Sequence, residues 1–311
     1  MQGSKSAAAF TVAVALSAWA ANDSVEADRQ QSAFRAGVDL VSFSVTATDS
    51  SRRYVPDLVR EDFVVTENGV PQSLTFFAKA GTPLALGLLI DTSASMEQSL
   101  ATAQEAAVGF VRQIAPSDLV TVVGFDSKVQ IAQAPTSDRQ VLENVIRQTR
   151  AGGSTALYNA VYITLKELNK LPIDTAGMPR RRAIIVLSDG EDTSSLVGFD
   201  EVLDLAARSD TIIYTIGLGL SAEAARHNDG DGQFVLRRLA QQTGGRAFFP
   251  QRVNDLAAIY NEVRDELSSQ YALAYESSNA PPDGQWRRVT VRVGRPGVVV
   301  RTRPGYFAPA R

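Results

Sequence analysis

Two carboxylates in this chain stand where they could bind a metal ion together with several hydroxyl groups. The apolar run 84–90 ends at Asp91, and a second apolar run, 183–187, leads to Asp189. Carboxylate and hydroxyl oxygens are hard ligands, which favour Mg²⁺, Ca²⁺ or Mn²⁺ over softer metals. Ser93 and Ser95 follow the first carboxylate, and the segment Gly152-Gly153-Ser154-Thr155-Ala156 supplies another hydroxyl on a glycine turn in front of a helix.

The two carboxylates are expected to face one crevice. In open α/β sheets the ligand crevice lies at the carboxyl ends of the strands, where the connections change direction. Asp91 and Asp189 both follow buried strands, so both should reach it. Mg²⁺ binds about six oxygens and retains water readily. Only two carboxylates compensate the dication, which leaves the site electrophilic and able to accept a carboxylate from another molecule.

Alternating strands and helices must position these groups. Continuous apolar runs are typical of strands covered on both faces, as in parallel sheets. The region therefore predicts a doubly wound α/β domain, with a mostly parallel central sheet and helices on both faces. Strands are expected at 84–91, 119–125, 183–187, 211–216 and 246–249, with a short hairpin partner at 128–131. Helices are expected at 97–114, 138–149, 156–169, 199–208, 234–242 and 253–269.

The segments on either side of this domain, 36–81 and 270–311, alternate apolar and polar residues with the period of two that predicts half-buried strands. Asn68-Gly69 is a strong hairpin signal, and the return strand is expected to carry Leu74 and Phe76. Each segment is too short to be a stable sheet alone. We therefore expect the two flanks to pack together as one small antiparallel β unit.

Composition excludes several kinds of function. The 311 residues include no cysteine and one histidine, His227. Disulfides, Cys-ligated metals, thiol nucleophiles and two-histidine metal sites are therefore impossible within one chain. The formal net charge of −3 makes nucleic acid a poor partner. Hydrophobic residues at 44% and charged residues at 21% are typical of a globular protein.

The N-terminus resembles a signal peptide in its order of features. Lys5 precedes an apolar stretch, which is followed by Ala18-Trp19-Ala20. We expect cleavage after residue 20, a linker over 21–35, and export to the periplasm or medium. A disordered, alanine-rich start or an apolar helix of the fold is the alternative. No later segment has the roughly 20 apolar residues of a membrane span.

Other polar residues have simpler explanations. Asp126 is expected in a hairpin turn, because Asp favours turns. The run around His227 lacks the spacing of a calcium loop, which favours a solvated loop. Asp91 alone could be a helix cap, so the metal site depends on the whole set of residues.

The order Asp91-x-Ser93-x-Ser95, then Thr155, then Asp189-Gly190 resembles the metal-ion-dependent adhesion site of von Willebrand factor A domains. The resemblance covers about residues 82–269. The whole chain resembles exported bacterial proteins related to this family, as described in acidobacteria. The flanking motifs that carry this are 37–41, 61–63 and 303–307.

The resemblance implies roles for these residues. Ser93 and Ser95 would bind the metal directly, and Asp91 often acts through water. Thr155 and Asp189 would bind directly or through water, depending on conformation. An acidic side chain from a partner protein commonly completes the coordination.

The leading hypothesis is a non-enzymatic, adhesion-type module that binds Mg²⁺, with Mn²⁺ or Ca²⁺ as alternatives. It would capture a protein with an exposed Asp or Glu, most naturally in the cell envelope. One alternative is a metal-assisted hydrolase, which would need a general base that the motif lacks. The other is a structural or assembly protein whose metal only stabilises the loops.

Overall fold

The computed structural model describes residues 40–79, 83–171, 180–219, 230–279 and 283–309. Leu40–Arg311 form one compact unit. The predicted signal peptide at 1–20, the linker at 21–35 and His227 lie outside the described residues. Within the described residues, no helix is both long and apolar enough to cross a membrane.

A six-stranded sheet forms the centre of the α/β domain, in the order β10-β9-β8-β5-β6-β7. Its strands pair in parallel except β7, which runs antiparallel to β6. β5 and β8 are neighbours although two strands and three α-helices separate them in sequence, so the connections change direction between them. The strands are β5 (Leu84–Asp91), β6 (Leu119–Phe125), β7 (Val129–Thr136), β8 (Arg181–Ser188), β9 (Thr211–Gly217) and β10 (Ala247–Phe248).

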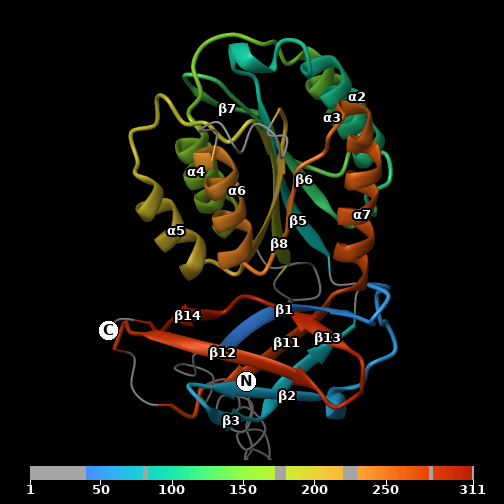
Figure 1. Ribbon diagram of the computed structural model, residues 1–311, viewed down its shortest axis with the longest axis vertical. Helices are drawn as coiled ribbons and strands as arrows, with labels where there is room; N and C mark the ends of the chain where they lie inside the picture. Colours follow the sequence, from blue (N-terminus) through green and yellow to red (C-terminus); the bar gives the residue numbers. More distant parts are fainter. Residues whose placement is uncertain (1–39, 80–82, 172–179, 220–229, 280–282, 310–311) are drawn as a thin grey trace, which may run out of the picture. The chain divides into compact units, whose positions relative to one another are not determined.

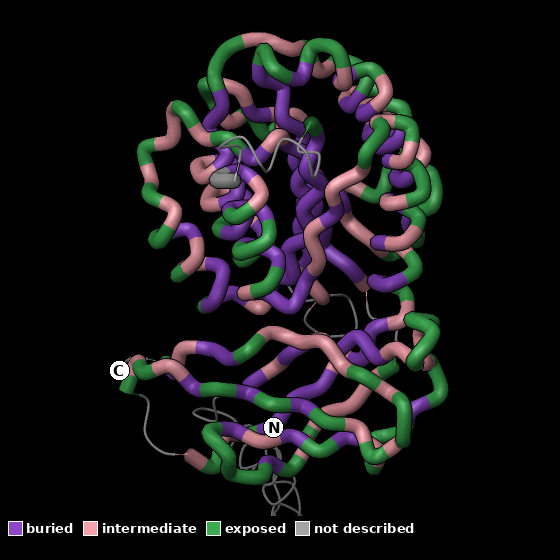
Figure 2. The backbone as a smooth tube through the Cα atoms, in the orientation of Figure 1, coloured by how far each residue is buried: buried purple, intermediate pink, exposed green. Residues whose placement is uncertain are grey.

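Helices cover both faces of this sheet (Figure 1). Helices α2 (Leu100–Val111), α3 (Arg139–Gln148) and α7 (Leu256–Ser269) pack on one face. Helices α4 (Leu157–Asn169), α5 (Phe199–Arg208) and α6 (Gly230–Gln242) cover the other. Short 3₁₀ turns lie at η1 (Arg60–Asp62), η2 (Ala94–Met96) and η4 (Val253–Asp255). The central strands are buried along almost their whole length (Figure 2), as their continuous apolar runs predict.

The two flanks build a β-sandwich of two four-stranded antiparallel sheets, ordered β13-β1-β11-β4 and β14-β12-β2-β3. N-terminal strands pair with C-terminal ones in both sheets: β1 with β11, and β2 with β12. The predicted α/β fold with a β unit from both flanks is therefore confirmed. The strands are β1 (Leu40–Thr48), β2 (Phe63–Glu67), β3 (Val70–Gln72), β4 (Leu74–Ala78), β11 (Tyr271–Glu276), β12 (Trp286–Val293), β13 (Val299–Arg301) and β14 (Gly305–Phe307).

Two details of the strand prediction were wrong. The strand that returns from the Asn68-Gly69 turn is only β3, because Leu74–Ala78 crosses to the other sheet and pairs with β11. There Phe77 stacks on Tyr271, with ring centroids 5.8 Å apart. This contact between the partly buried Phe77 and the buried Tyr271 favours the crossing over a longer hairpin. The predicted strand at 128–131 is also longer in the structure, because β7 pairs with β6 as far as Thr136.

A buried carboxylate connects the two sheets of the sandwich. Glu67 has no exposed surface, and its oxygens accept hydrogen bonds from the hydroxyls of Tyr275 (2.7 Å), Tyr306 (2.9 Å) and Ser277 (2.8 Å). Asn279 Nδ2 donates a fourth at 2.9 Å. Burial alone would raise the pKa of Glu67, but these hydrogen bonds outweigh it and hold the pKa below its ordinary value.

Candidate metal centre

Three loops meet at the carboxyl edge of the central sheet. Asp91 ends β5, and Asp189 directly follows β8, the strand beside it. The turn at Gly152-Gly153 contacts the loop after Asp91 through two backbone hydrogen bonds, from Gly152 N to Thr92 O at 2.8 Å and from Ala94 N to Gly153 O at 3.1 Å. The site thus combines residues that are about 60 and 100 positions apart.

Four of the five predicted side chains lie within one hydrogen-bonded chain. The hydroxyls of Ser93 and Ser95 are 3.0 Å apart, and Ser95 Oγ donates to Asp189 Oδ2 at 2.5 Å. Asp91 Oδ1 accepts the backbone N–H of Ser93 at 2.8 Å. Asp91 and Ser93 are buried, whereas Ser95 is exposed, so the cluster runs from the interior to the surface.

Thr155 reaches this region through its backbone. Its N–H donates to the hydroxyl of Thr193 at 3.0 Å, and its carbonyl accepts the N–H groups of Thr193 and Ser194. Within the described residues, the Thr155 hydroxyl makes no hydrogen bond to the other four predicted side chains. It is buried and remains available as a donor oxygen.

Ser188 belongs to this cluster, although it was not among the site residues predicted from the sequence. Its hydroxyl donates to Asp91 Oδ2 at 2.6 Å and accepts the N–H of Gly190 at 3.0 Å. It therefore fixes the orientation of the Asp91 carboxylate and the course of the loop after β8. The signal in the sequence is a polar residue at the last position of an apolar strand.

Gly190 is required by the conformation of the second loop. Its φ of +83° lies in the left-handed region, and a Cβ at this position would stand 2.6 Å from the carbonyl oxygen of Gly232. The backbone of α6 thus packs directly against the loop that carries Asp189. This requirement for glycine explains why Gly190 follows Asp189 after β8.

Side chains from the next loop hold the start of α4. Asp192 Oδ1 accepts the N–H of Tyr158 at 3.0 Å. Asn159 Oδ1 in turn accepts the N–H groups of Leu196 and Val197, at 3.1 and 3.2 Å. These reciprocal bonds fix the loop after Asp189 against the helix that follows Thr155.

The electrostatics of the cluster favour a bound cation. Burial raises the pKa of Asp91 to about 6, and the nearby charge of Asp189 adds to the rise. Hydrogen bonds from Ser188 and Ser93 oppose it without cancelling it. A buried carboxylate that is only partly compensated by hydrogen bonds is stabilised by a nearby positive charge.

The donor set is mixed. Within the described residues there is no group of three or more Asp, Glu, His or Cys side chains that could hold a metal ion. Two carboxylates and three or four hydroxyls are instead available, which suits a hard divalent cation that retains water. The residues present therefore fit Mg²⁺ or Mn²⁺ better than a softer metal.

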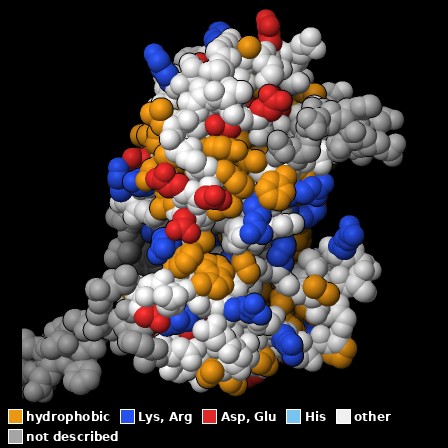
Figure 3. Space-filling model, turned by 60° about the vertical axis from the view of Figure 1, so that its left-hand side comes forward, with side chains coloured by type: hydrophobic (Ala, Val, Ile, Leu, Met, Phe, Trp, Pro, Cys, Tyr) orange, Lys and Arg blue, Asp and Glu red, His pale blue; other side chains and the backbone are white. Residues whose placement is uncertain are grey.

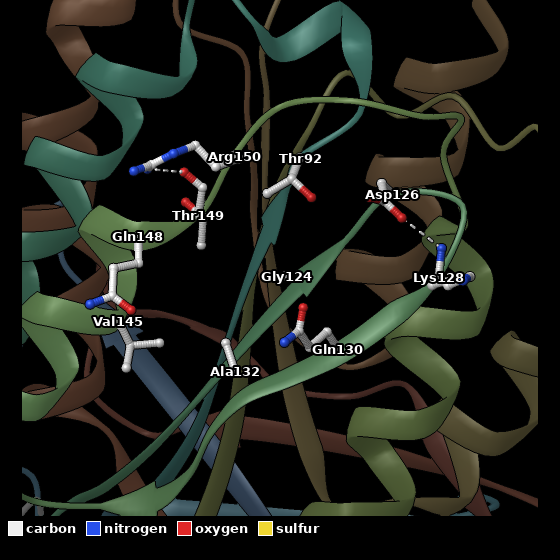
Figure 4. A pocket seen from close by; sticks show the side chains of 10 residues that line it. All are labelled: Thr92, Gly124, Asp126, Lys128, Gln130, Ala132, Val145, Gln148, Thr149 and Arg150. Carbon is white, nitrogen blue, oxygen red and sulfur yellow. Dashed lines mark hydrogen bonds between the residues drawn. The ribbon is translucent and has the colours of Figure 1, made fainter.

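A polar pocket of about 480 Å³ adjoins the site between β6, β7 and the end of α3 (Figure 4). Thr92, which lies between Asp91 and Ser93 in the sequence, lines this pocket, and Lys128 and Arg150 contribute positive charge. Asp126 occupies the β6–β7 turn, where its Oδ1 accepts the N–H of Lys128 at 2.8 Å. Asp126 thus makes the turn contact expected of it, and its carbonyl also accepts the N–H of Ala156 at 2.7 Å.

Comparison with known proteins identifies the domain. A model of the von Willebrand factor type A domain matches residues 86–191. A UPF0353 protein from Nocardia farcinica is 23% identical over 242 residues, covering 68% of this chain and 70% of that protein. A UPF0353 protein from Mycobacterium tuberculosis is 23% identical over 221 residues, covering 65% of this chain and 64% of that relative.

Among solved structures, a von Willebrand factor type A protein from Catenulispora acidiphila superposes with a TM-score of 0.52 at 13% sequence identity. The superposition covers 88% of this chain and 75% of that one. At this identity the likeness shows a shared fold. Its coverage exceeds the α/β domain, which means that part of the β-sandwich also has a counterpart.

Proposed function

Because this chain contains a von Willebrand factor type A domain, with its polar cluster at the carboxyl edge of the sheet, we propose that it is a metal-dependent protein-binding module. Mg²⁺ would be held by oxygens of Asp91, Ser93, Ser95, Thr155 and Asp189, with Mn²⁺ or Ca²⁺ as alternatives. The observation that carries the proposal is the hydrogen-bonded chain Ser93–Ser95–Asp189 above the buried Asp91.

The arrangement of exposure supports capture of an outside ligand. Ser95 is exposed and Asp189 partly exposed, so the cluster is accessible from one side only. Two carboxylates balance the formal charge of a dication without excess negative charge, and the hydroxyl ligands are neutral, so the metal can still accept an Asp or Glu side chain from a partner. Lys128 and Arg150 in the adjoining pocket would favour the same acidic partner.

The residues around the cluster also bear on hydrolysis. A hydrolase needs a group that accepts a proton from water near neutral pH. The side chains that hydrogen-bond within the cluster are serine hydroxyls and the two carboxylates already assigned to the metal. These contacts support a binding role over a catalytic one.

Metal binding is tested by calorimetry with Mg²⁺ and Mn²⁺. Asp91→Asn and Asp189→Asn should each abolish the binding heat. Asp126→Asn is the matched control, because it removes one negative charge at the end of the neighbouring strand but outside the cluster. Equal binding by all four proteins would refute the assigned ligands.

Partner capture is tested by immobilising the chain in cell-envelope extract. A specific protein should be retained on the immobilised chain in the presence of magnesium and released by chelator. The Ser95→Ala variant should fail to retain that protein. If metal binding vanished in Asp189→Asn while capture persisted, the metal would be structural and the binding surface would lie elsewhere.

We also propose that the chain is exported, on the basis of the Ala18-Trp19-Ala20 pattern. The intact mass of protein from an exporting host should correspond to a chain that starts at Ala21. A full-length mass for protein held in the cytoplasm would refute this.

A further inference from the structure

The outer face of the sandwich sheet that contains β12 carries a row of unneutralised positive charge. Along β12 the exposed positions alternate with buried ones, so Arg288, Thr290 and Arg292 lie on the same outer face. Trp286, half-buried, begins the row. Arg288 and Arg292 form no salt bridge with any described residue, whereas Arg287 on the opposite face pairs with Asp283 at 2.8 Å.

Two concavities of about 630 and 590 Å³ lie along this row and share Trp286, Arg288 and Thr290. One extends to the C-terminal part of α6, and the other extends to the Asn68-Gly69 turn. Their described linings contain no Asp or Glu. They do contain three arginines, three side-chain amides and two hydroxyls: Arg238, Arg288, Arg292, Gln241, Gln242, Asn68, Thr66 and Thr290.

This surface is positive although the chain as a whole has a formal net charge of −3. Lys and Arg side chains are spread over the β-sandwich in Figure 3, with few acidic ones beside them in that view. Positive charge concentrated on one face of an acidic protein is not required for solubility, and it attracts an anionic ligand.

We propose that this face, defined by Trp286, Arg288, Thr290 and Arg292, binds an acidic polysaccharide. Arg288 and Arg292 are four residues apart on one strand, a separation of about 13 Å, so the ligand must be an extended chain with repeated negative charges. The amides and hydroxyls between the arginines match a ligand that carries hydroxyls as well as acids. The Trp286 ring offers a flat apolar surface for a sugar ring.

The same geometry disfavours the other anionic polymers. β12 lies between β14 and β2 in its sheet, so an acidic peptide cannot add to it as a further strand. Only three arginines line the face, within a chain of net negative charge, which is weak for a nucleic acid. The surface is separate from the metal cluster, so the inference does not depend on the proposed metal function.

The test uses the full chain carrying Trp19→Phe, which leaves Trp286 as the one remaining tryptophan. Polygalacturonate, a uronic acid polymer, is titrated at low ionic strength while the fluorescence of Trp286 is followed. We expect saturable binding with a change in Trp286 emission, and an affinity that falls as salt is added.

Arg288→Gln combined with Arg292→Gln should weaken this binding by about tenfold or more, because two charged hydrogen-bond donors are lost. The matched control combines Arg147→Gln with Arg252→Gln, which removes the same charge from exposed arginines of the α/β domain. The control should bind like the parent.

The proposal would be overturned by no binding of polygalacturonate, by equal binding of the Arg288 and Arg292 double variant, or by tighter binding of poly-L-glutamate or single-stranded poly(dT). Chelator should leave polygalacturonate binding unchanged. Loss of binding in chelator would place the ligand at the metal cluster instead and would refute the assignment to this face.

Discussion

Asp91→Asn should make the metal-free protein more stable while removing its response to metal. Asp91 is fully buried, and burial raises the pKa of its carboxyl from 3.8 to about 6. At pH 7 the ionised group therefore costs about 3 kcal/mol relative to an unperturbed carboxylate, at about 1.4 kcal/mol for each pH unit. Asparagine has nearly the same shape and no charge.

Part of this gain is lost in the contacts of the new side chain. The amide oxygen can still accept the Ser93 N–H, which is 2.8 Å from Oδ1 in the parent. The amide nitrogen cannot accept the Ser188 hydroxyl, which donates to Oδ2. With about 1 kcal/mol for that lost hydrogen bond, the variant should be about 1 to 2 kcal/mol more stable than the parent in chelator.

The assay is urea denaturation at pH 7, in chelator and in excess Mg²⁺. Magnesium should raise the free energy of unfolding of the parent and leave that of Asp91→Asn unchanged. Asp91 takes up a proton at a higher pH in the folded parent than in the unfolded chain. The stability by which the parent falls short of Asp91→Asn in chelator should therefore shrink as the pH falls from 6 to 4. A variant less stable than the parent in chelator, or one stabilised by Mg²⁺ like the parent, would refute this reasoning.

Three other substitutions test contacts near the cluster and within the β-sandwich. Gly190→Ala should lower the free energy of unfolding by about 2 kcal/mol or more, because φ is positive and the new Cβ would strike the backbone of α6. Gly198→Ala is the control, because the space around Gly198 is open. Equal urea midpoints for the two variants would contradict the packing argument. Ser188→Ala should weaken magnesium affinity about tenfold in calorimetry although Ser188 is not an assigned ligand, since it orients Asp91; an unchanged affinity would remove that role. Glu67→Gln should cost about 2 kcal/mol at pH 7, whereas Glu276→Gln, on an exposed residue, should cost little. Because the pKa of Glu67 is lowered in the fold, the stability that its carboxylate contributes is present above pH 4.5, the ordinary pKa, and is lost as the pH falls through the pKa of the folded state. A stability difference between the parent and Glu67→Gln that persisted in acid would show that another contact is responsible.

The elements of the α/β domain could be predicted from the sequence because their signals are local. Buried parallel strands need continuous apolar runs, and both β5 and β8 have them. Residues at the ends of such strands share one edge of the sheet, so Asp91 and Asp189 could be placed together without coordinates. The alternation along β12 likewise predicts which of its side chains face outward.

Other features depend on which distant segments pack together. The hairpin signal at Asn68-Gly69 specifies the turn, but only the aromatic core of the sandwich decides that Leu74–Ala78 leaves that hairpin for the other sheet. The concavity between β12 and α6 has no counterpart in either segment alone.

The metal site likewise combines features set by the local sequence with features set by packing between distant segments. The sequence by itself determined the types and order of its oxygen donors and the edge of the sheet on which they lie. The tertiary structure decided that the Ser188 hydroxyl donates to Asp91 and that Gly190 packs against Gly232. It also decided that, among the described residues, the Thr155 hydroxyl makes no hydrogen bond to the other four predicted side chains. Strand periodicity is set by neighbouring residues, whereas hydrogen-bond partners and close backbone approaches are set by packing between elements far apart in the chain.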